Sequence, residues 1–207
     1  MGKFTSKNTG VLTGKVGNVV YTTWRGIEII RSRPRKSNKP PSEAQLSQRL
    51  RMKTVSQFLS PLRLIINNYF NEQHVHKSAM NLATSYHLKE AVSGSYPDYQ
   101  INFQKAIISK GELSMPGSIQ ISTNSGLSLS WDTNASGLSK DDDRLLFVFY
   151  IENENKFTIK YDVAQRIDSA CTLVFPQADT TYQCWLLFYA SDGKCNSNSL
   201  YLGPIDG

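Results

Sequence analysis

Leu145-Leu-Phe-Val-Phe-Tyr-Ile151 and Cys184-Trp-Leu-Leu-Phe-Tyr-Ala190 are the two longest apolar runs in the 207-residue sequence. Each has seven residues, whereas a helix needs about 20 apolar residues to cross a bilayer. The runs therefore indicate no membrane span. They are rich in aromatic residues and bounded by turn residues, which is typical of β-strands.

Five further strands are expected around these two runs. The seven predicted strands are Ile119–Thr123, Leu127–Asp132, Leu145–Asn153, Lys156–Val163, Ala170–Phe175, Tyr182–Ala190 and Ser199–Gly203. Seven short strands in about 90 residues, separated by turn residues, indicate an immunoglobulin-like sandwich. Trp131 and Trp185 are its expected core aromatics. No cysteine lies on the second predicted strand, so a fibronectin type III-like sandwich is the closer resemblance.

The N-terminal part predicts a β-hairpin followed by an extended arm. Asn18–Trp24 and Ile27–Arg33 are rich in β-branched and aromatic residues, and a break containing Gly26 separates them, which is a hairpin pattern. Residues 31–41 then read RSRPRKSNKPP, with three prolines and five basic residues. Proline disfavours both helices and central strands. The arm is therefore expected to be extended.

Three helices and one strand are predicted between the arm and Met115-Pro116-Gly117, the expected domain boundary. Ser42 and Gln45 form a capping-box pattern that begins the first helix. The other helices are expected at Pro61–Phe70 and Ser78–Val92. Tyr99–Ser109 alternates as a strand does and should pair with the N-terminal hairpin, because an unpaired strand leaves backbone groups unsatisfied.

The sequence therefore predicts an α+β protein of two parts. Residues 1–114 form a basic module of hairpin, arm and helices, and residues 115–207 form the immunoglobulin-like, fibronectin type III-like sandwich.

No catalytic or metal-binding pattern is present, and no cofactor is expected. The three cysteines, Cys171, Cys184 and Cys195, have neither disulfide-framework nor zinc-site spacing. His74 and His76 are expected in a polar loop. Asp141-Asp142-Asp143 lacks the spacing of a calcium loop and is expected to be a solvated inter-strand loop. The sequence thus favours a protein that is not an enzyme.

Charge is unevenly distributed along the chain. Residues 1–63 carry thirteen Lys or Arg and two acidic residues, a net charge of +11, while residues 64–207 sum to −5. Three interpretations are open: assembly with other protein subunits, binding of nucleic acid phosphates, or a solvated basic surface. The residues expected in the contact are Trp24, Arg25, Arg31, Arg33, Arg35, Lys36, Lys39, Pro40 and Pro41.

Residues 13–49, TGKVGNVVYTTWRGIEIIRSRPRKSNKPPSEAQLSQR, resemble the signature of an uncharacterised Bacteroidota family. The resemblance extends through Ala91–Pro97 to Ser191–Lys194 and Ser197–Ser199. Tyr21 stands where the family has a small residue, and Arg25 where it has Lys. The family has no established activity, so the resemblance implies no site residues. A weaker similarity to phage virion or tail-associated proteins implies a structural role.

We therefore expect a structural subunit that binds copies of itself or other structural subunits and forms part of a phage-related virion or appendage. A nucleic-acid-associated protein is the alternative. No secretory signal is visible at the N-terminus, so synthesis in the cytoplasm without membrane insertion is expected, with the virion as final location. Nothing in exposed loops such as Ser136–Asp143 requires a carbohydrate or receptor contact.

Overall fold

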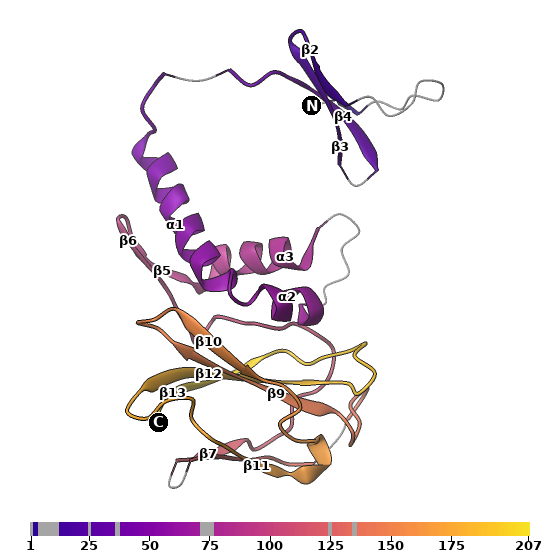
Figure 1. Ribbon diagram of the computed structural model, residues 1–207, viewed down its shortest axis with the longest axis vertical. Helices are drawn as coiled ribbons and strands as arrows, with labels where there is room; N and C mark the ends of the chain where they lie inside the picture. Colours follow the sequence, from indigo (N-terminus) through magenta and orange to yellow (C-terminus); the bar gives the residue numbers. More distant parts are fainter. Residues whose placement is uncertain are drawn as a thin grey trace. The chain divides into compact units, whose positions relative to one another are not determined.

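The structure, a computed structural model, describes residues 2–3, 13–24, 26–35, 38–70, 77–123, 126–133 and 136–207. The chain separates into two compact units, Met1–Ser42 (unit 1) and Glu43–Gly207 (unit 2). It is a mixed α+β protein with most of its regular structure in strands of several sheets, and the described residues contain three α-helices (Figure 1).

Unit 1 is an antiparallel sheet with the strand order β1-β4-β3-β2. Its strands are β1 (Gly2–Lys3), β2 (Gly14–Val16), β3 (Val19–Trp24) and β4 (Ile27–Ser32). The predicted hairpin is confirmed as β3 and β4, in which Trp24 pairs with Ile27. Gly26 in the connecting turn has a φ of 77°, a conformation that glycine adopts readily. Residues 33–35 and 38–42 form neither helix nor strand, as their prolines predict.

Unit 2 begins with the helices α1 (Glu43–Leu59), α2 (Arg63–Tyr69) and α3 (Ala79–Tyr86). The amide of Asn81 donates a 3.2 Å hydrogen bond to the Ser78 hydroxyl, which caps α3. α3 continues directly into a π-helical turn, His87–Ala91. All three predicted helices are confirmed, although the second begins at Arg63 because residues 61–62 form a turn.

All seven strands predicted in the C-terminal part are present, in two antiparallel sheets. One sheet has the order β11-β8-β7 and the other β10-β9-β12-β13. Their bounds are β7 (Gln120–Ser122), β8 (Leu127–Ser130), β9 (Arg144–Ile151), β10 (Lys156–Lys160), β11 (Ala170–Leu173), β12 (Thr181–Tyr189) and β13 (Leu200–Asp206).

The two central strands β9 and β12 are buried on both faces. Side chains of successive strand residues point to opposite faces of a sheet. Phe147 and Phe149 pack with Leu129 of β8 in one core, whereas Leu146 and Val148 pack with the helices in another. Because neither face meets water, these strands are continuous apolar runs rather than alternating ones.

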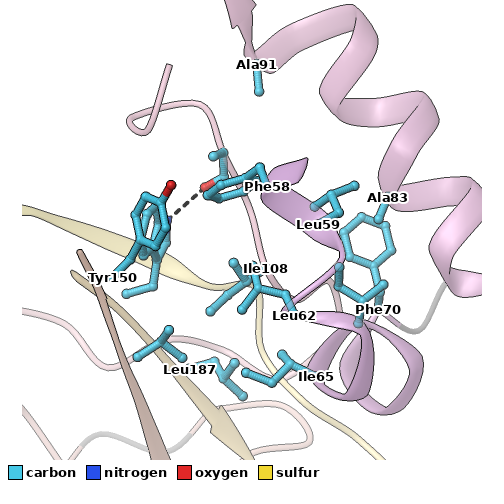
Figure 2. Close-up of a cluster of buried hydrophobic side chains, with 14 of the residues drawn as sticks. Phe58, Leu59, Leu62, Ile65, Phe70, Ala83, Ala91, Ile108, Tyr150 and Leu187 are labelled. Atoms are coloured by element: carbon cyan, nitrogen blue, oxygen red, sulfur yellow. Dashed lines mark hydrogen bonds between the residues drawn. The ribbon is translucent and has the colours of Figure 1, made fainter. Parts of the chain in front are cut away.

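The core on the helical side joins elements that lie far apart in the sequence. Figure 2 shows its labelled side chains, which are Phe58, Leu59, Leu62, Ile65, Phe70, Ala83, Ala91, Ile108, Tyr150 and Leu187. The helices and the sheet thus bury one shared hydrophobic surface within unit 2. Residues on both sides of position 114 contribute to it, and the boundary expected at that position stays a prediction.

The strand expected at Tyr99–Ser109 is shorter and pairs differently from the prediction. β6 (Asp98–Ile101) forms a hairpin with β5 (Val92–Ser95), not with the N-terminal hairpin. The reason is local: the segment that directly precedes β6 offers a partner across a two-residue turn, so little entropy is lost in closing the loop. Figure 1 shows this hairpin next to α1.

The last two residues of the expected strand, Ile108 and Ser109, belong instead to a segment, residues 108–113, that forms a clasp of hydrogen bonds on the loop before β13. The hydroxyl of Ser199 accepts from the amide of Ile108 at 2.8 Å, and the Asn198 side chain accepts from the amide of Gly111 at 3.1 Å. The hydroxyl of Ser109 donates to the Ser197 carbonyl at 2.9 Å. The Ser-Asn-Ser motif of the family resemblance therefore has a structural role, since it supplies the partners of an irregular backbone segment.

Trp131 and Trp185 are both buried, but in different cores. Trp131 lies between the two sheets, as predicted. Trp185 lies on the helical side and donates to the Ala106 carbonyl at 3.0 Å, so its expected place between the sheets was wrong. The reason is the alternation of β12, which places the adjacent residue Cys184 on the inner face instead.

Candidate docking surface

The structure places most of the predicted contact residues on the surface of unit 1. Trp24 ends β3 with 47% of its surface exposed. Arg31, Arg33 and Arg35 are exposed at the end of β4 and just beyond it. Three further predicted contact residues are exposed in the segment before α1: Lys39, Pro40 and Pro41. The last two predicted contact residues, Arg25 and Lys36, lie outside the described residues.

The strand register brings some of these residues onto one face of the sheet. Val20 pairs with Arg31 on β4 and with Lys15 on β2. Paired residues share a face, and so do residues two apart along a strand. Trp24 therefore lies on the same face as Arg31 and Lys15, which gives this face an aromatic ring and two cationic groups.

The described residues of unit 1 form little hydrophobic core of their own. Among its described residues, Val20 is the single buried hydrophobic side chain, and Val16 is 66% exposed. The unit comprises Met1–Ser42 and contains no cysteine. Chains of about 40 residues usually need a disulfide, a metal or an oligomeric partner to be stable. A sheet of this kind gains stability when a partner covers it.

The two units differ in charge. Unit 1 carries nine Lys or Arg and one acidic residue, for a net charge of +8, whereas unit 2 carries fourteen and sixteen, for −2. A hollow beside β4 is lined by Asn18, Ser32, Arg33, Pro34 and Arg35. The Arg33 amide donates to the Asn18 carbonyl at 2.7 Å, which fixes the start of the arm against the β2–β3 turn. Guanidinium groups bind carboxylates and phosphates, often bidentately, so this surface suits an anionic partner.

A buried ion pair in unit 2 corrects the expectation of a solvated Asp141–Asp143 loop at one residue, Asp143, whereas Asp141 and Asp142 are exposed. Asp143 and Arg166 both have fully buried side chains, and Arg166 Nε lies 3.1 Å from Asp143 Oδ2. Arg166 also donates to the Ser114 carbonyl at 2.9 Å, and its guanidinium lies 4.7 Å from the centre of the Phe188 ring. Asp143 is thus a buried partner of Arg166 and not a solvated loop residue. The sequence offered no signal for it, because its partner lies 23 residues away.

Asp162 is the centre of a polar cluster at the surface. It accepts hydrogen bonds from Tyr189 at 2.5 Å and from Arg144 at 3.1 Å. The Tyr189 hydrogen bond lowers the pKa of Asp162, and burial, followed by this bond, raises the pKa of Tyr189. Both pKa values move away from neutrality. The pair is therefore poorly suited to general acid–base catalysis at neutral pH.

The cysteines on β11 and β12, Cys171 and Cys184, are also held in their neutral form. Burial raises the pKa of Cys184 to about 12 and that of Cys171 to about 11. The nucleophilic form of cysteine is the thiolate, so neither side chain is activated. Within the described residues, no group of three or more His, Cys, Asp or Glu side chains is arranged to hold a metal ion.

His87 is fully buried in the π-helical turn, and this makes the stability of unit 2 depend on pH. Its Nδ1 lies 2.8 Å from the Ala83 carbonyl, while Nε2 is buried without a hydrogen-bond partner among the described residues. Burial lowers the pKa of His87. As the pH falls below the unfolded value of about 6.5, the unfolded chain takes up the proton first, and the folded state is destabilised.

We expect the free energy of unfolding to fall by up to about 1.4 kcal/mol per pH unit below pH 6.5, until the folded His87 titrates. Urea unfolding at pH 7.5 and pH 5 measures this change. A His87→Leu variant is the comparison, because it removes the titration of His87 and leaves all other titrating groups in place. Equal pH dependence in both proteins would show that His87 does not contribute.

The longest helix of the described residues is α1, and none of their helices is both long and apolar enough to span a bilayer. Residues 10–203 match a family of unknown function, DUF6266. The match covers nearly the whole chain, and the protein belongs to this family. Searches of curated proteins and of solved structures found no match.

Proposed function

We propose that the protein is a structural subunit without enzymatic activity, which docks onto copies of itself or onto other structural subunits through unit 1. The observation that carries this proposal is the combination of a +8 net charge with a single buried hydrophobic residue among the described residues of unit 1. Such a unit is stabilised when an anionic partner covers it. Trp24, Arg31, Arg33 and Arg35 would lie in the contact, and Pro40 and Pro41 would fix the path of the arm.

We further infer that the C-terminal strands form a fibronectin type III-like sandwich that faces outward. Constant-type immunoglobulin domains pair their fourth strand with the sheet of the first, second and fifth. Here β10, the fourth strand, pairs with β9 instead, which supports the variant. A hydrogen-bonded tyrosine also supports this inference: the Tyr182 hydroxyl donates to the Gln177 carbonyl at 2.9 Å and accepts from the Gln177 amide at 2.8 Å. This is the geometry of the tyrosine corner of such sandwiches.

By analogy, the weaker similarity to phage virion or tail-associated proteins supports a virion or appendage as the place of assembly. Nucleic acid is the second candidate partner. The observation in its favour is the row of exposed cationic residues Arg31, Arg33 and Arg35 beside the exposed ring of Trp24. Phosphates would bind the cations, and bases would stack on the ring.

A charge-removal variant tests the proposal. We expect the substitution of Arg31, Arg33 and Arg35 by Gln to weaken self-association or binding to a structural partner by at least about tenfold, because charge-assisted contacts are lost. Sedimentation velocity and light scattering on the full chain measure the effect. The matched control replaces three exposed lysines of unit 2 by Gln, namely Lys53, Lys156 and Lys160, and loses the same charge.

Parallel titrations with DNA and RNA at several salt concentrations separate the two candidates. A monomer that binds nucleic acid with a steep salt dependence would replace the assembly proposal by its alternative. Equal effects of the two triple variants on association would show that net charge, and not the surface of unit 1, is responsible.

A further inference from the structure

The sheet of unit 1 has a second face, opposite the face that carries Trp24. Tyr21 of β3 pairs with Ile30 of β4, and Val19 of β3 pairs with Val16 of β2. Paired residues share a face of a sheet, and so do residues two apart along a strand, such as Val19 and Tyr21. These four residues therefore form an apolar surface across three neighbouring strands, which we call the apolar face.

The side of the sheet that carries the apolar face has no Lys or Arg among the described residues. Its other described residues are Gly2, Gly14, Thr23, Glu28 and Ser32. The basic residues Lys15 and Arg31 lie on the opposite side. A unit with a net charge of +8 thus keeps one side of its sheet without a cation.

The apolar face is incompletely buried. Val16 is 66% exposed, and Val19, Tyr21 and Ile30 are half-buried. Val20, the single buried hydrophobic residue among the described residues of unit 1, belongs to the opposite side of the sheet. Sheets bury their apolar faces against a second layer. The apolar face therefore needs a layer of similar residue type.

The described surface of unit 2 shows no comparable set of apolar residues. No two of its exposed large hydrophobic side chains lie on the same element or loop. The most exposed are Leu64 on α2 and Val174 after β11, at 72% and 81%. Single exposed apolar residues of this kind are ordinary on protein surfaces. In residue type and extent, the surface that matches the apolar face is the same face of a second copy.

Charge restricts how two copies of unit 1 can meet. A contact through the basic sides would bring Lys15 and Arg31 of one copy against the same residues of the other, and such juxtaposed like charges are costly. In a contact through the apolar faces, the cations would lie on the outer surfaces of two sheets that are about 10 Å apart. This distance exceeds the Debye length of about 8 Å at physiological ionic strength, so the repulsion is largely screened.

We propose that the apolar faces of two copies of unit 1 pack against each other as a two-layer β-sandwich. The proposal rests on the proposed function and deepens it, because it assigns the pairing of two copies to one side of the sheet. The other side, with Trp24 and Arg31, then docks the pair onto further anionic subunits. Both copies use the same surface, so the contact is two-fold symmetric.

Two adjacent isoleucines on β4 give a matched test of the contact. Ile30 belongs to the apolar face and Ile29 to the opposite side, and both are half-buried. We expect Ile30→Lys to weaken the monomer–dimer step of the full chain at least about tenfold, because it removes an apolar contact and places a cation between the sheets. Ile29→Lys adds the same charge and should change this step less than about threefold. Sedimentation velocity over a range of protein concentrations measures both, and equal effects would overturn the apolar face as the contact.

Cysteine labelling tests the contact without disrupting it. Val16 and Lys15 are adjacent and exposed on β2, and they lie on opposite sides of the sheet. We expect alkylation of the Val16→Cys variant to slow at least about fivefold as the full chain is concentrated and pairs, whereas the rate for Lys15→Cys stays constant. The wild type gives the background of the native cysteines. Protection of Val16→Cys that does not depend on concentration would show that the same chain covers the face, and full reactivity at every concentration would show that nothing covers it; either result overturns the proposal.

Salt and the triple arginine variant, in which Gln replaces Arg31, Arg33 and Arg35, separate this proposal from the proposed function. High salt should strengthen the pair or leave it unchanged, because it screens repulsion, and should weaken docking onto anionic subunits. The triple arginine variant should keep the pair and lose association beyond it. A pair that is lost in high salt and in this variant would overturn the apolar contact and leave the proposed function intact. A pair that persists in a variant with undiminished further association would overturn the proposed function alone.

Discussion

Replacing Gly111 by alanine is expected to destabilise unit 2 by about 3–5 kcal/mol. A Cβ atom at this position would lie 1.9 Å from the Asn196 carbonyl oxygen and 2.7 Å from its carbonyl carbon. Both are backbone atoms, so no rotation of a side chain relieves the overlap. The carbonyl would have to move, and it accepts the Leu113 amide at 3.0 Å. The Asn196 side chain, which donates to the Tyr69 carbonyl at 2.8 Å, would move with it.

Urea unfolding of the full chain, followed by tryptophan fluorescence, measures this effect. Gly117→Ala is the control, because a Cβ there would meet only the Asp132 side chain, at 3.8 Å. We expect that change to be neutral or slightly stabilising, since alanine restricts the unfolded chain. A loss of stability below about 1 kcal/mol for Gly111→Ala would contradict this prediction, because it would show that the backbone at Asn196 can move away from the new Cβ atom with little loss of stability.

The strands of unit 2 could be predicted because their patterns are local. Leu145–Ile151 and Cys184–Ala190 are apolar without interruption, and the structure covers both faces of β9 and β12. The sequence did not indicate that helices cover one of these faces. This is why Trp185 was expected between the sheets although it packs against Ala106.

The errors arise where pairing depends on distant or irregular segments. Alternation in Tyr99–Ser109 predicts a strand but does not identify its partner, β5, whose first residue, Val92, is the last residue of the helix expected at Ser78–Val92. Residues 108–113 form hydrogen bonds with the side chains of Asn198 and Ser199 and with the backbone carbonyls of Asn196 and Ser197. No local pattern encodes such contacts. The motif Ser197-Asn198-Ser199 was visible in the sequence, but its role follows from the fold alone.

The positive charge of the unit 1 surface could be predicted more fully, because charge follows directly from the composition of the sequence. Arg31, Arg33 and Arg35 are exposed, as a basic surface requires, whereas their part in a contact stays a prediction. The shared face of Trp24 and Lys15 required the strand register.

Replacing Arg166 by methionine is expected to destabilise unit 2 by about 3–5 kcal/mol, because it leaves the Asp143 carboxylate buried without a counter-ion. Both side chains are fully buried. Within the described residues, Asp143 Oδ1 and Arg166 Nη1 already have no hydrogen-bond partner. Desolvation therefore opposes much of the attraction within the pair. Adding Asp143→Asn to the Arg166→Met variant should recover most of the loss.

A double-mutant cycle with urea unfolding at pH 7 measures the coupling between the two residues. Asp143→Asn retains an oxygen that can accept from the Lys140 amide, which now donates to Asp143 Oδ2 at 2.9 Å. The comparison is Arg144→Met, whose partner Asp162 lies 3.1 Å away in a pair with 43% and 52% of the side chains exposed. Solvent screens that pair, so its loss should be much smaller. If Arg166→Met and Arg144→Met cost the same, or if Asp143→Asn restores nothing, then Arg166 stabilises unit 2 through its contacts with Phe188 and Ser114 and not through charge.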